Sequence, residues 1–264
     1  MLAAGDGERA GQGFGGGEDV ENLLQRAALG DVHGQHRRHQ AACGVGAFVF
    51  TSTTSAFGRA LSPPPGQPAA WLTEDVEPVP KNIYGVTKVA AENLCELHHR
   101  DTGMPCLVLR TSRFFPEEDD IAAVRDARED ANNQANEFLY RRVDIEDVVD
   151  AHLLALAKAR EIGFARYIVS ATTPFTREDL AGLRADAPAV VRRHVPEYAG
   201  EYARRGWTMF ESIDRVYDNA KARAALGWRP NVDFARVIER LRESDDIRSP
   251  MAQAVGAKGY HRTR

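Results

Sequence analysis

Two short apolar runs flank a long helical stretch, and this order constrains the fold more than any other feature of the chain. Residues 46–51 and 106–110 are rich in Val, Leu and Phe and have the length of buried strands. Between them, Asn82 can cap a helix that runs to about Asp101 and that Gly103 can end. A strand, a helix and a second strand predict a β-α-β unit of a parallel sheet. We therefore predict an α/β fold.

Tyr84 and Lys88 lie four residues apart at the start of the predicted helix. A helix places such residues on one face, so the phenol and the ammonium can meet the same ligand. A phenol is a weak acid at neutral pH, but a neighbouring cation favours its ionised form, which makes Tyr84 a candidate proton carrier. Hydroxyl-bearing residues, 51–54, end the preceding strand. A Tyr-x-x-x-Lys pair by itself also arises by chance.

Five motifs follow one another between about Gly46 and Arg240. They are an apolar strand with a Ser/Thr run and a closing aromatic-Gly pair (48–58), Tyr-Gly-Val-Thr-Lys (84–88), Leu-Arg (109–110), Val-Asp-Ile-Glu-Asp-Val (143–148) and Leu-Gly-Trp-Arg-Pro (226–230). In this order they resemble the extended short-chain dehydrogenase/reductase superfamily, the NAD-dependent epimerases and dehydratases that include UDP-galactose 4-epimerase.

The resemblance implies roles for individual residues. Tyr84 and Lys88 match the family's catalytic pair, and Thr53 falls where the family keeps its third catalytic hydroxyl. NAD or NADP would exchange hydride with a carbinol carbon while Tyr84 moves the hydroxyl proton, Lys88 binds the nicotinamide ribose and Thr53 positions the substrate oxygen. The residues expected at the cofactor are Thr53, Tyr84, Lys88 and Ser112, and those expected at the substrate are Thr54, Arg113 and Arg141.

Two departures from the family pattern concern the substrate. Arg113 stands where the family usually has an asparagine, so it either grips a carboxylate or phosphate or pairs with the acidic residues 117–120. The epimerases place an arginine for the diphosphate shortly before the helix that starts near Ile145. Direct alignment puts Tyr140 in that position, with Arg141 next to it. A sugar-nucleotide-like substrate, or another carbinol or carbonyl compound, is therefore expected.

The first 45 residues do not match the rest of the chain. The family opens with an apolar strand, a glycine-rich turn and a helix, which hold the dinucleotide. Residues 1–45 have many glycines but no such strand, so we interpret them as an aberrant or flexible segment. Out-of-frame translation or a wrongly placed start codon would produce a segment of this kind. We expect weak NAD(H) binding or none. His33, His36 and His39 lack a carboxylate or cysteine at a fixed short spacing, so no metal site is predicted.

These features divide the chain into three parts. Residues 46–115 are expected to form the C-terminal half of an NAD(P)-binding Rossmann domain, a partial parallel sheet whose N-terminal strands are missing or aberrant. Residues 116–264 would supply a smaller substrate domain and the closing elements. The intact Thr-Tyr-Lys set favours an epimerase, dehydratase or oxidoreductase. The absent glycine turn favours the alternative, a truncated relative that binds a partner or ligand without turnover.

Composition argues against several classes of partner. The formal net charge of -4 over 264 residues gives no general attraction to nucleic acid or to an anionic membrane. No apolar run reaches transmembrane length, and no leader suggests secretion. Cys43, Cys95 and Cys106 lack metal or redox spacing, which favours structural thiols in a reducing cytoplasm. The family often pairs through its Tyr-Lys helix, so a homodimer is a candidate partner.

Two further helices are expected beyond the β-α-β unit. Residues 121–135 are charged and alanine-rich, which predicts an exposed helix. Residues 145–159 predict an amphipathic helix with Val148, Leu153 and Leu156 on its inward side.

Overall fold

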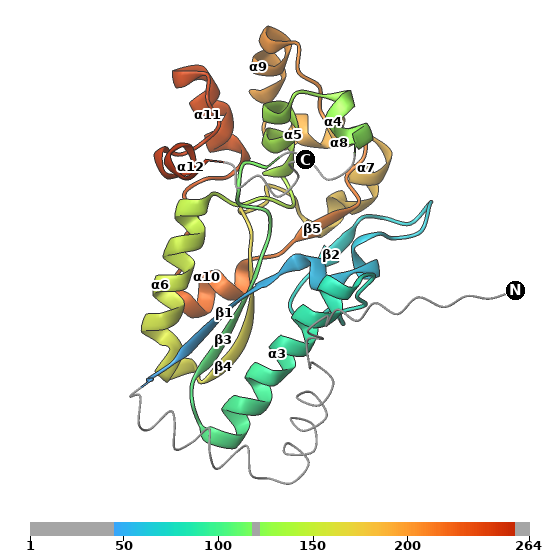
Figure 1. Cartoon of the computed structure of the whole chain (residues 1–264). Helices are drawn as coiled ribbons and strands as arrows, with labels where there is room; N and C mark the ends of the chain where they lie inside the picture. The colour runs from blue at the N-terminus through green and yellow to red at the C-terminus, as the bar shows by residue number, and fades with distance from the viewer. Residues whose placement is uncertain (1–44, 118–121, 257–264) are drawn as a thin grey trace, which may run out of the picture. The chain divides into compact units, whose positions relative to one another are not determined.

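The computed structural model describes residues 45–117 and 122–256 (Figure 1). The N-terminal segment with its glycines and histidines, Cys43 and the acidic residues 118–120 lie outside the described residues. From Gly46 onward the chain forms one unit, and the candidate site lies within it.

A parallel sheet of three strands organises this unit, as the sequence predicted. The strands are β1 (Phe48–Thr53), β3 (Cys106–Thr111) and β4 (Phe164–Val169), in the order β1-β3-β4. The register places Ser52 opposite Arg110. The central strand β3 is buried along its whole length, because it has a neighbour on each side and a helix over each face. All three strands end at the same edge of the sheet.

Helix α3 (Ile83–Thr102) joins β1 to β3 and confirms the predicted β-α-β unit. Its first turn is capped by Asn82, whose side-chain oxygen accepts a hydrogen bond from the amide of Gly85 at 2.8 Å. It ends at Gly103, which adopts a left-handed conformation with φ of 73°. The helix packs on one face of the sheet through Cys95, which joins the apolar cluster of β3.

Helix α6 (Ile145–Ile162) covers the opposite face of the sheet (Figure 1). Val148 is buried as expected, but Leu153 and Leu156 are 61% and 54% exposed, so the expected inward position of these two leucines is wrong. The buried face continues instead through the alanines, which recur at the helical period and let the helix approach the strands closely. These are Ala151, Ala155 and Ala159.

The segment that was expected to be one exposed helix forms two, α4 (Ala122–Ala127) and α5 (Asp130–Glu137). The expectation of exposure is wrong for α5 from Asn132 onward, where the polar residues are buried. Asn132 and Asn136 each donate a side-chain N–H to the carbonyl oxygen of Thr208, at 3.1 and 2.9 Å. Amide side chains with such partners are buried at low cost, whereas composition alone predicts exposure.

Shorter elements make up the rest of the described chain, and several of the helices pack around a larger apolar cluster. A two-stranded parallel sheet pairs β2 with β5. The elements are η1 (Thr54–Phe57), η2 (Arg59–Leu61), β2 (Ala70–Leu72), η3 (Arg177–Asp179), α7 (Leu180–Ala185), α8 (Ala187–His194), α9 (Tyr198–Arg205), β5 (Arg215–Tyr217), α10 (Ala220–Leu226), α11 (Phe234–Ser244) and α12 (Pro250–Val255).

Asp147 ties α6 to the segment that follows α10. Its carboxylate accepts the amide N–H groups of Asn231 and Val232 at 2.7 and 3.0 Å, and its carbonyl oxygen accepts the indole N–H of Trp228 at 3.0 Å. Trp228 is buried, as expected for core packing. Burial raises the pKa of Asp147 to about 6, and this effect exceeds that of the two N–H hydrogen bonds, which lower the pKa.

Three observations concern membranes, metals and thiols. None of the helices in the described ranges is long and apolar enough to cross a membrane. The same residues contain no group of three His, Cys, Asp or Glu side chains arranged to hold a metal ion. Cys95 and Cys106 are buried free thiols, and burial raises the pKa of Cys106 to about 11.

Candidate active site

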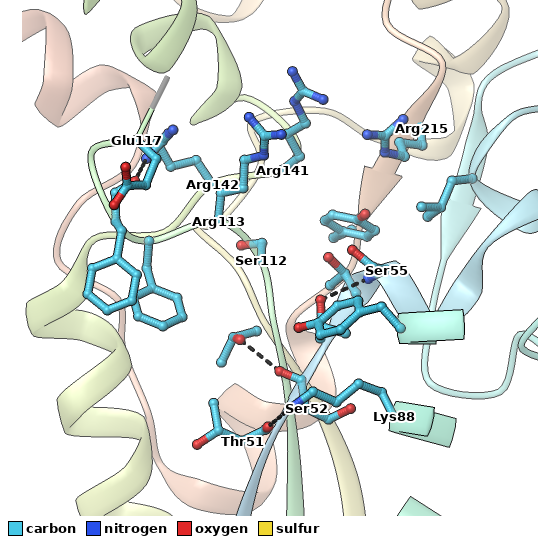
Figure 2. A pocket seen from close by; sticks show the side chains of 18 of the residues that line it. Thr51, Ser52, Ser55, Lys88, Ser112, Arg113, Glu117, Arg141, Arg142 and Arg215 are labelled. Carbon is cyan, nitrogen blue, oxygen red and sulfur yellow. Dashed lines mark hydrogen bonds between the residues drawn. The ribbon is translucent and has the colours of Figure 1, made fainter. Parts of the chain in front are cut away.

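A cavity of about 630 Å³ lies beyond the carboxyl ends of β1 and β3 (Figure 2). This is the position at which open α/β sheets bind ligands. Every residue that the sequence singled out for cofactor or substrate lines the cavity, although these residues come from four separate segments. They are Thr53, Thr54, Tyr84, Lys88, Ser112, Arg113 and Arg141.

Lys88 is fixed beside the phenol of Tyr84. Its ammonium donates a hydrogen bond to the carbonyl oxygen of Thr51 at 3.1 Å. The same nitrogen lies 5.0 Å from the ring centre of Phe50 and 5.8 Å from that of Tyr84, within the range of a cation–π contact. Tyr84 is half-exposed on the cavity wall. A ligand in the cavity can therefore meet the phenol and the ammonium together.

The hydroxyl groups at the end of β1 have different partners. Thr53 accepts the amide N–H of Ser55 at 3.1 Å, so its own O–H remains available as a donor. Thr54 is buried at the start of η1. Thr51 lies on the other side, with its hydroxyl oxygen 2.7 Å from Nε2 of His152 on α6. Of these three, Thr53 is the one best placed to donate to a substrate oxygen.

Ser112 lies directly after β3 and is buried at the cavity wall. Its amide and its hydroxyl both donate to the carbonyl oxygen of Val169, at 2.9 and 3.2 Å. The hydroxyl proton is therefore directed at β4, and the oxygen offers only lone pairs to a ligand.

A cluster of arginines surrounds the buried carboxylate of Glu137. Arg141 and Arg142 each place a terminal nitrogen 2.7 Å from one of its oxygens, and Arg113 places one at 3.4 Å. Arg142 also donates to the carbonyl oxygen of Phe115 at 2.8 Å. Glu137, a carboxylate on α5 that the sequence did not point to, is thus one ion-pair partner of Arg113. Residues 118–120 of the expected acidic group lie outside the described residues. One carboxylate orients three guanidinium groups.

Arg215 on β5 joins this cluster from a distant part of the chain. It forms an ion pair with Asp214 at 2.9 Å, and its guanidinium carbon lies 5.4 Å from the ring centre of Tyr140, as does that of Arg141. Within the described part of the chain, the Nε atom of Arg215 is buried and has no hydrogen-bond partner. A buried donor without a partner is costly, so Arg215 is held here at the expense of one unmet hydrogen bond.

Sequence reasoning missed Glu137, Arg142 and Arg215. Arg142 could have been found, since it follows Arg141 directly and precedes the Val-Asp-Ile-Glu-Asp-Val motif. No local signal marks Glu137 or Arg215, because each reaches the cavity only through the packing of α5 and β5.

The cavity is cationic and has two chemically distinct ends. Figure 2 shows the arginines gathered at one end, and Lys88 with Thr51 and Ser52 at the other. Glu117 is the carboxylate that lines the cavity among the described residues, whereas the cations are Lys81, Lys88, Arg113, Arg141, Arg142 and Arg215. An anionic ligand is favoured by this balance of charge.

The parallel sheet, the cavity at its strand ends and the Tyr-Lys pair on α3 define a Rossmann-like α/β protein. The model of the NAD dependent epimerase/dehydratase family matches residues 20–169, and the chain belongs to this family. The motif resemblance starts at Gly46, but the family match begins earlier, at residue 20. The match therefore includes residues that lie outside the described ranges.

Known relatives are similar over part of their length. The chain is 28% identical over 219 residues to dTDP-glucose 4,6-dehydratase from Streptomyces antibioticus. The aligned region covers 75% of this chain and 56% of that protein. The chain thus spans little more than half the length of this curated relative. UDP-glucuronic acid 4-epimerase from Bacillus cereus, solved in complex with NAD, is 19% identical, with 79% of this chain and 64% of that chain covered and a TM-score of 0.47. RMD from Pseudomonas aeruginosa, complexed with NADPH, is 21% identical, with 75% and 66% covered and a TM-score of 0.46.

Proposed function

We propose that the chain acts as an NAD(P)-dependent epimerase, dehydratase or oxidoreductase on a carbinol or carbonyl carbon of an anionic, sugar-nucleotide-like substrate. The observation that supports this most strongly is the cavity with Tyr84 and Lys88 at one end and the arginine cluster at the other (Figure 2). Family membership supports the reaction class.

The residues near Lys88 fit the nicotinamide half of NAD or NADP. Lys88 would hold the ribose hydroxyls, and the lone pairs of Ser112 face the cavity, where they can accept from a carboxamide. Bound NAD(P) supplies the hydride acceptor or donor. Among the described residues no glycine-rich turn follows a strand, so they offer no comparable site for the pyrophosphate and the adenosine ribose.

Three side chains would handle the proton. Tyr84 removes it from the substrate hydroxyl, or returns it in the reverse direction. The Lys88 ammonium stabilises the negative charge that then develops on the phenol oxygen. The free O–H of Thr53 holds the substrate oxygen at the phenol.

The arginine end would bind the charged part of the substrate. A phosphate or carboxylate can accept from the guanidinium groups of Arg113, Arg141 and Arg215, the first two of which Glu137 orients. This supports a diphosphate in that region. Tyr140 stands where the epimerases have their diphosphate-binding arginine, and Arg141 and Arg215 would supply the positive charge in its place.

Substitution of the proton carrier tests the proposal. Sugar nucleotides, sugar acids and neutral ketones would be screened as substrates at the highest soluble NAD(P) concentrations. Tyr84→Phe should abolish most turnover and leave dinucleotide affinity unchanged, whereas Lys88→Ala should lower both turnover and affinity. Full turnover in Tyr84→Phe would refute the assignment. Binding of a sugar nucleotide without turnover in the parent chain would favour the alternative, a non-catalytic binding protein.

Exposed apolar side chains on α3 support a homodimer. Ile83, Val86, Leu94 and Leu97 recur at the helical period and are exposed. A second copy could cover this stripe through its own α3. Sedimentation velocity of the parent and of Leu94→Glu would test this, because a charge at the centre of the stripe should shift a dimer to monomer. Equal sedimentation of both proteins would contradict it.

A further inference from the structure

Glu92 lies on the same side of α3 as the Tyr-Lys pair. Tyr84, Lys88 and Glu92 are spaced at i, i+4 and i+8, which places them in one row along the helix. Tyr84 is half-exposed at the cavity, whereas Glu92 is only 1% exposed and does not line it. A carboxylate buried at this depth requires partners.

The partners of Glu92 come from all three strands of the main sheet. Ser52 of β1 donates its hydroxyl to Oε1 at 2.5 Å. Arg110 of β3 places Nη2 2.7 Å from Oε2 and Nε 3.1 Å from both oxygens. Arg166 of β4 places Nε 3.2 Å from Oε2. One side chain therefore links α3 to the whole width of the sheet.

The link to β1 is adjacent to the contact that holds Lys88. Ser52 lies between Thr51, whose carbonyl oxygen accepts from Lys88, and Thr53, the candidate substrate hydroxyl. The carbonyl oxygen of Ser52 also accepts from the hydroxyl of Thr111 at 2.9 Å. Helix α3 is thus tied to the end of β1 at two successive turns, through Lys88 and through Glu92.

Arg110 extends this arrangement to the hydroxyl-bearing segment. Its guanidinium lies over the ring of Phe57, 4.9 Å from the ring centre, and Phe57 closes η1, which begins at Thr54. The position of η1 therefore depends on the same guanidinium that pairs with Glu92.

Stability alone gives a weak reason for this buried pair. Well-packed apolar residues of similar volume often stabilise a fold as much as a buried ion pair does, since both charges lose their hydration. Apolar packing is non-directional, however, and leaves a helix free to shift along a strand. A carboxylate with directed hydrogen bonds to three strands fixes the helix along its axis and in rotation.

We propose that Glu92 is a positioning residue that sets the distance between Lys88 and the end of β1. The proposal rests on the proposed role of Lys88 in the site. Removal of the Glu92 contacts lets α3 shift, so the Lys88 ammonium spends less time at the Thr51 carbonyl and more time in solvent.

Acylation of lysines by acetic anhydride, read by mass spectrometry, tests the proposal without any ligand or activity. Lys81, Lys158 and Lys221 serve as internal references in the same protein. Glu92→Gln removes the charge at constant size, and Ser52→Ala removes only the link to β1 while Arg110 and Arg166 keep their partner. Glu96→Gln is the matched control, because Glu96 pairs with Arg166 at 2.9 Å one turn further along α3 and is 46% exposed.

The Lys88 acylation rate, relative to the reference lysines, should rise several-fold in Glu92→Gln and in Ser52→Ala and stay at the parent value in Glu96→Gln. If Glu92→Gln fails to fold, Ser52→Ala decides. An unchanged rate in Ser52→Ala, or an equal rise in Glu96→Gln, would overturn the proposal. The outcome is independent of the Tyr84→Phe test, since a chain without turnover still reports the position of Lys88.

Discussion

Glu137 holds Arg142 in a buried ion pair, with Nη2 and Oε2 2.7 Å apart and both side chains under 5% exposed. The same carboxylate orients the more accessible Arg141 toward the cavity. The arginines of the cluster therefore divide into one that supports the structure and others that face a ligand.

This division predicts opposite results for two groups of substitutions. Arg141→Gln and Arg215→Gln should each weaken pyrophosphate binding about tenfold or more, because each removes a charge-assisted hydrogen bond worth about 1.5–3 kcal/mol. Arg142→Gln should instead lower the free energy of unfolding by about 3–5 kcal/mol, because it leaves Glu137 without its innermost partner. Calorimetric titration and urea unfolding measure the two effects. Arg236→Gln, a surface change on α11, should alter neither. Pyrophosphate affinity that is unchanged in Arg215→Gln would contradict an anion site at Arg215.

NADH affinity tests the interpretation of the N-terminal segment. Calorimetric titration of the parent chain should show no saturation in the micromolar range, because the nicotinamide half alone must offset the cost of ordering the whole ligand. Micromolar binding by the parent would show that residues 1–45 do build a cofactor site.

Asp147 predicts a distinct dependence of stability on pH. Its pKa is raised by burial to about 6 in the folded chain, from an ordinary value of 3.8, so the folded state binds the proton more tightly. The resulting stabilisation is complete below about pH 4 and is lost as the pH rises through about 6. Relative to Asp147→Asn, the unfolding free energy of the parent should fall over this range by on the order of 1–3 kcal/mol. A difference that grows with pH would mean that the N–H bonds from Asn231 and Val232 outweigh burial.

The two sides of α6 should respond differently to substitution. Ala155→Leu adds volume where the helix contacts the sheet and should cost about 1–3 kcal/mol of unfolding free energy. Leu153→Ala removes an exposed side chain and should change it by less than about 0.5 kcal/mol. Urea unfolding of both variants decides which face is buried. A larger loss in Leu153→Ala than in Ala155→Leu would restore the inward orientation that hydrophobicity alone predicts.

The elements with local signals were predictable from sequence. Asn82 and Gly103 mark the ends of α3, and the apolar runs before and after it form β1 and β3. These signals work because capping and strand burial depend on neighbouring residues. The four-residue spacing of Tyr84 and Lys88 was visible for the same reason.

The errors and omissions have a common physical cause, which is contact between distant segments. Leu153 was placed inward because leucine is more hydrophobic than alanine, but close approach of α6 to the sheet selects small residues. Residues of α5 were placed outward because the segment is charged and alanine-rich, yet Thr208 satisfies the amides of Asn132 and Asn136. Arg215 has no neighbour in sequence that reveals its place beside Tyr140.

The pairing of Ser52 with Arg110 across β1 and β3 has a consequence for how the chain reaches its native state. Side chains alternate between the two faces of a strand, so a slip of β1 by one residue would turn Ser52 away from Glu92 and bring Thr51 and Thr53 to that side. A threonine hydroxyl could then replace that of Ser52, but the same slip would turn Phe50 to the opposite face, away from Cys95 and Lys88. The observed alignment of β1 is therefore favoured as the sheet forms, because it places a hydroxyl at Glu92 and an aromatic ring at Lys88 together.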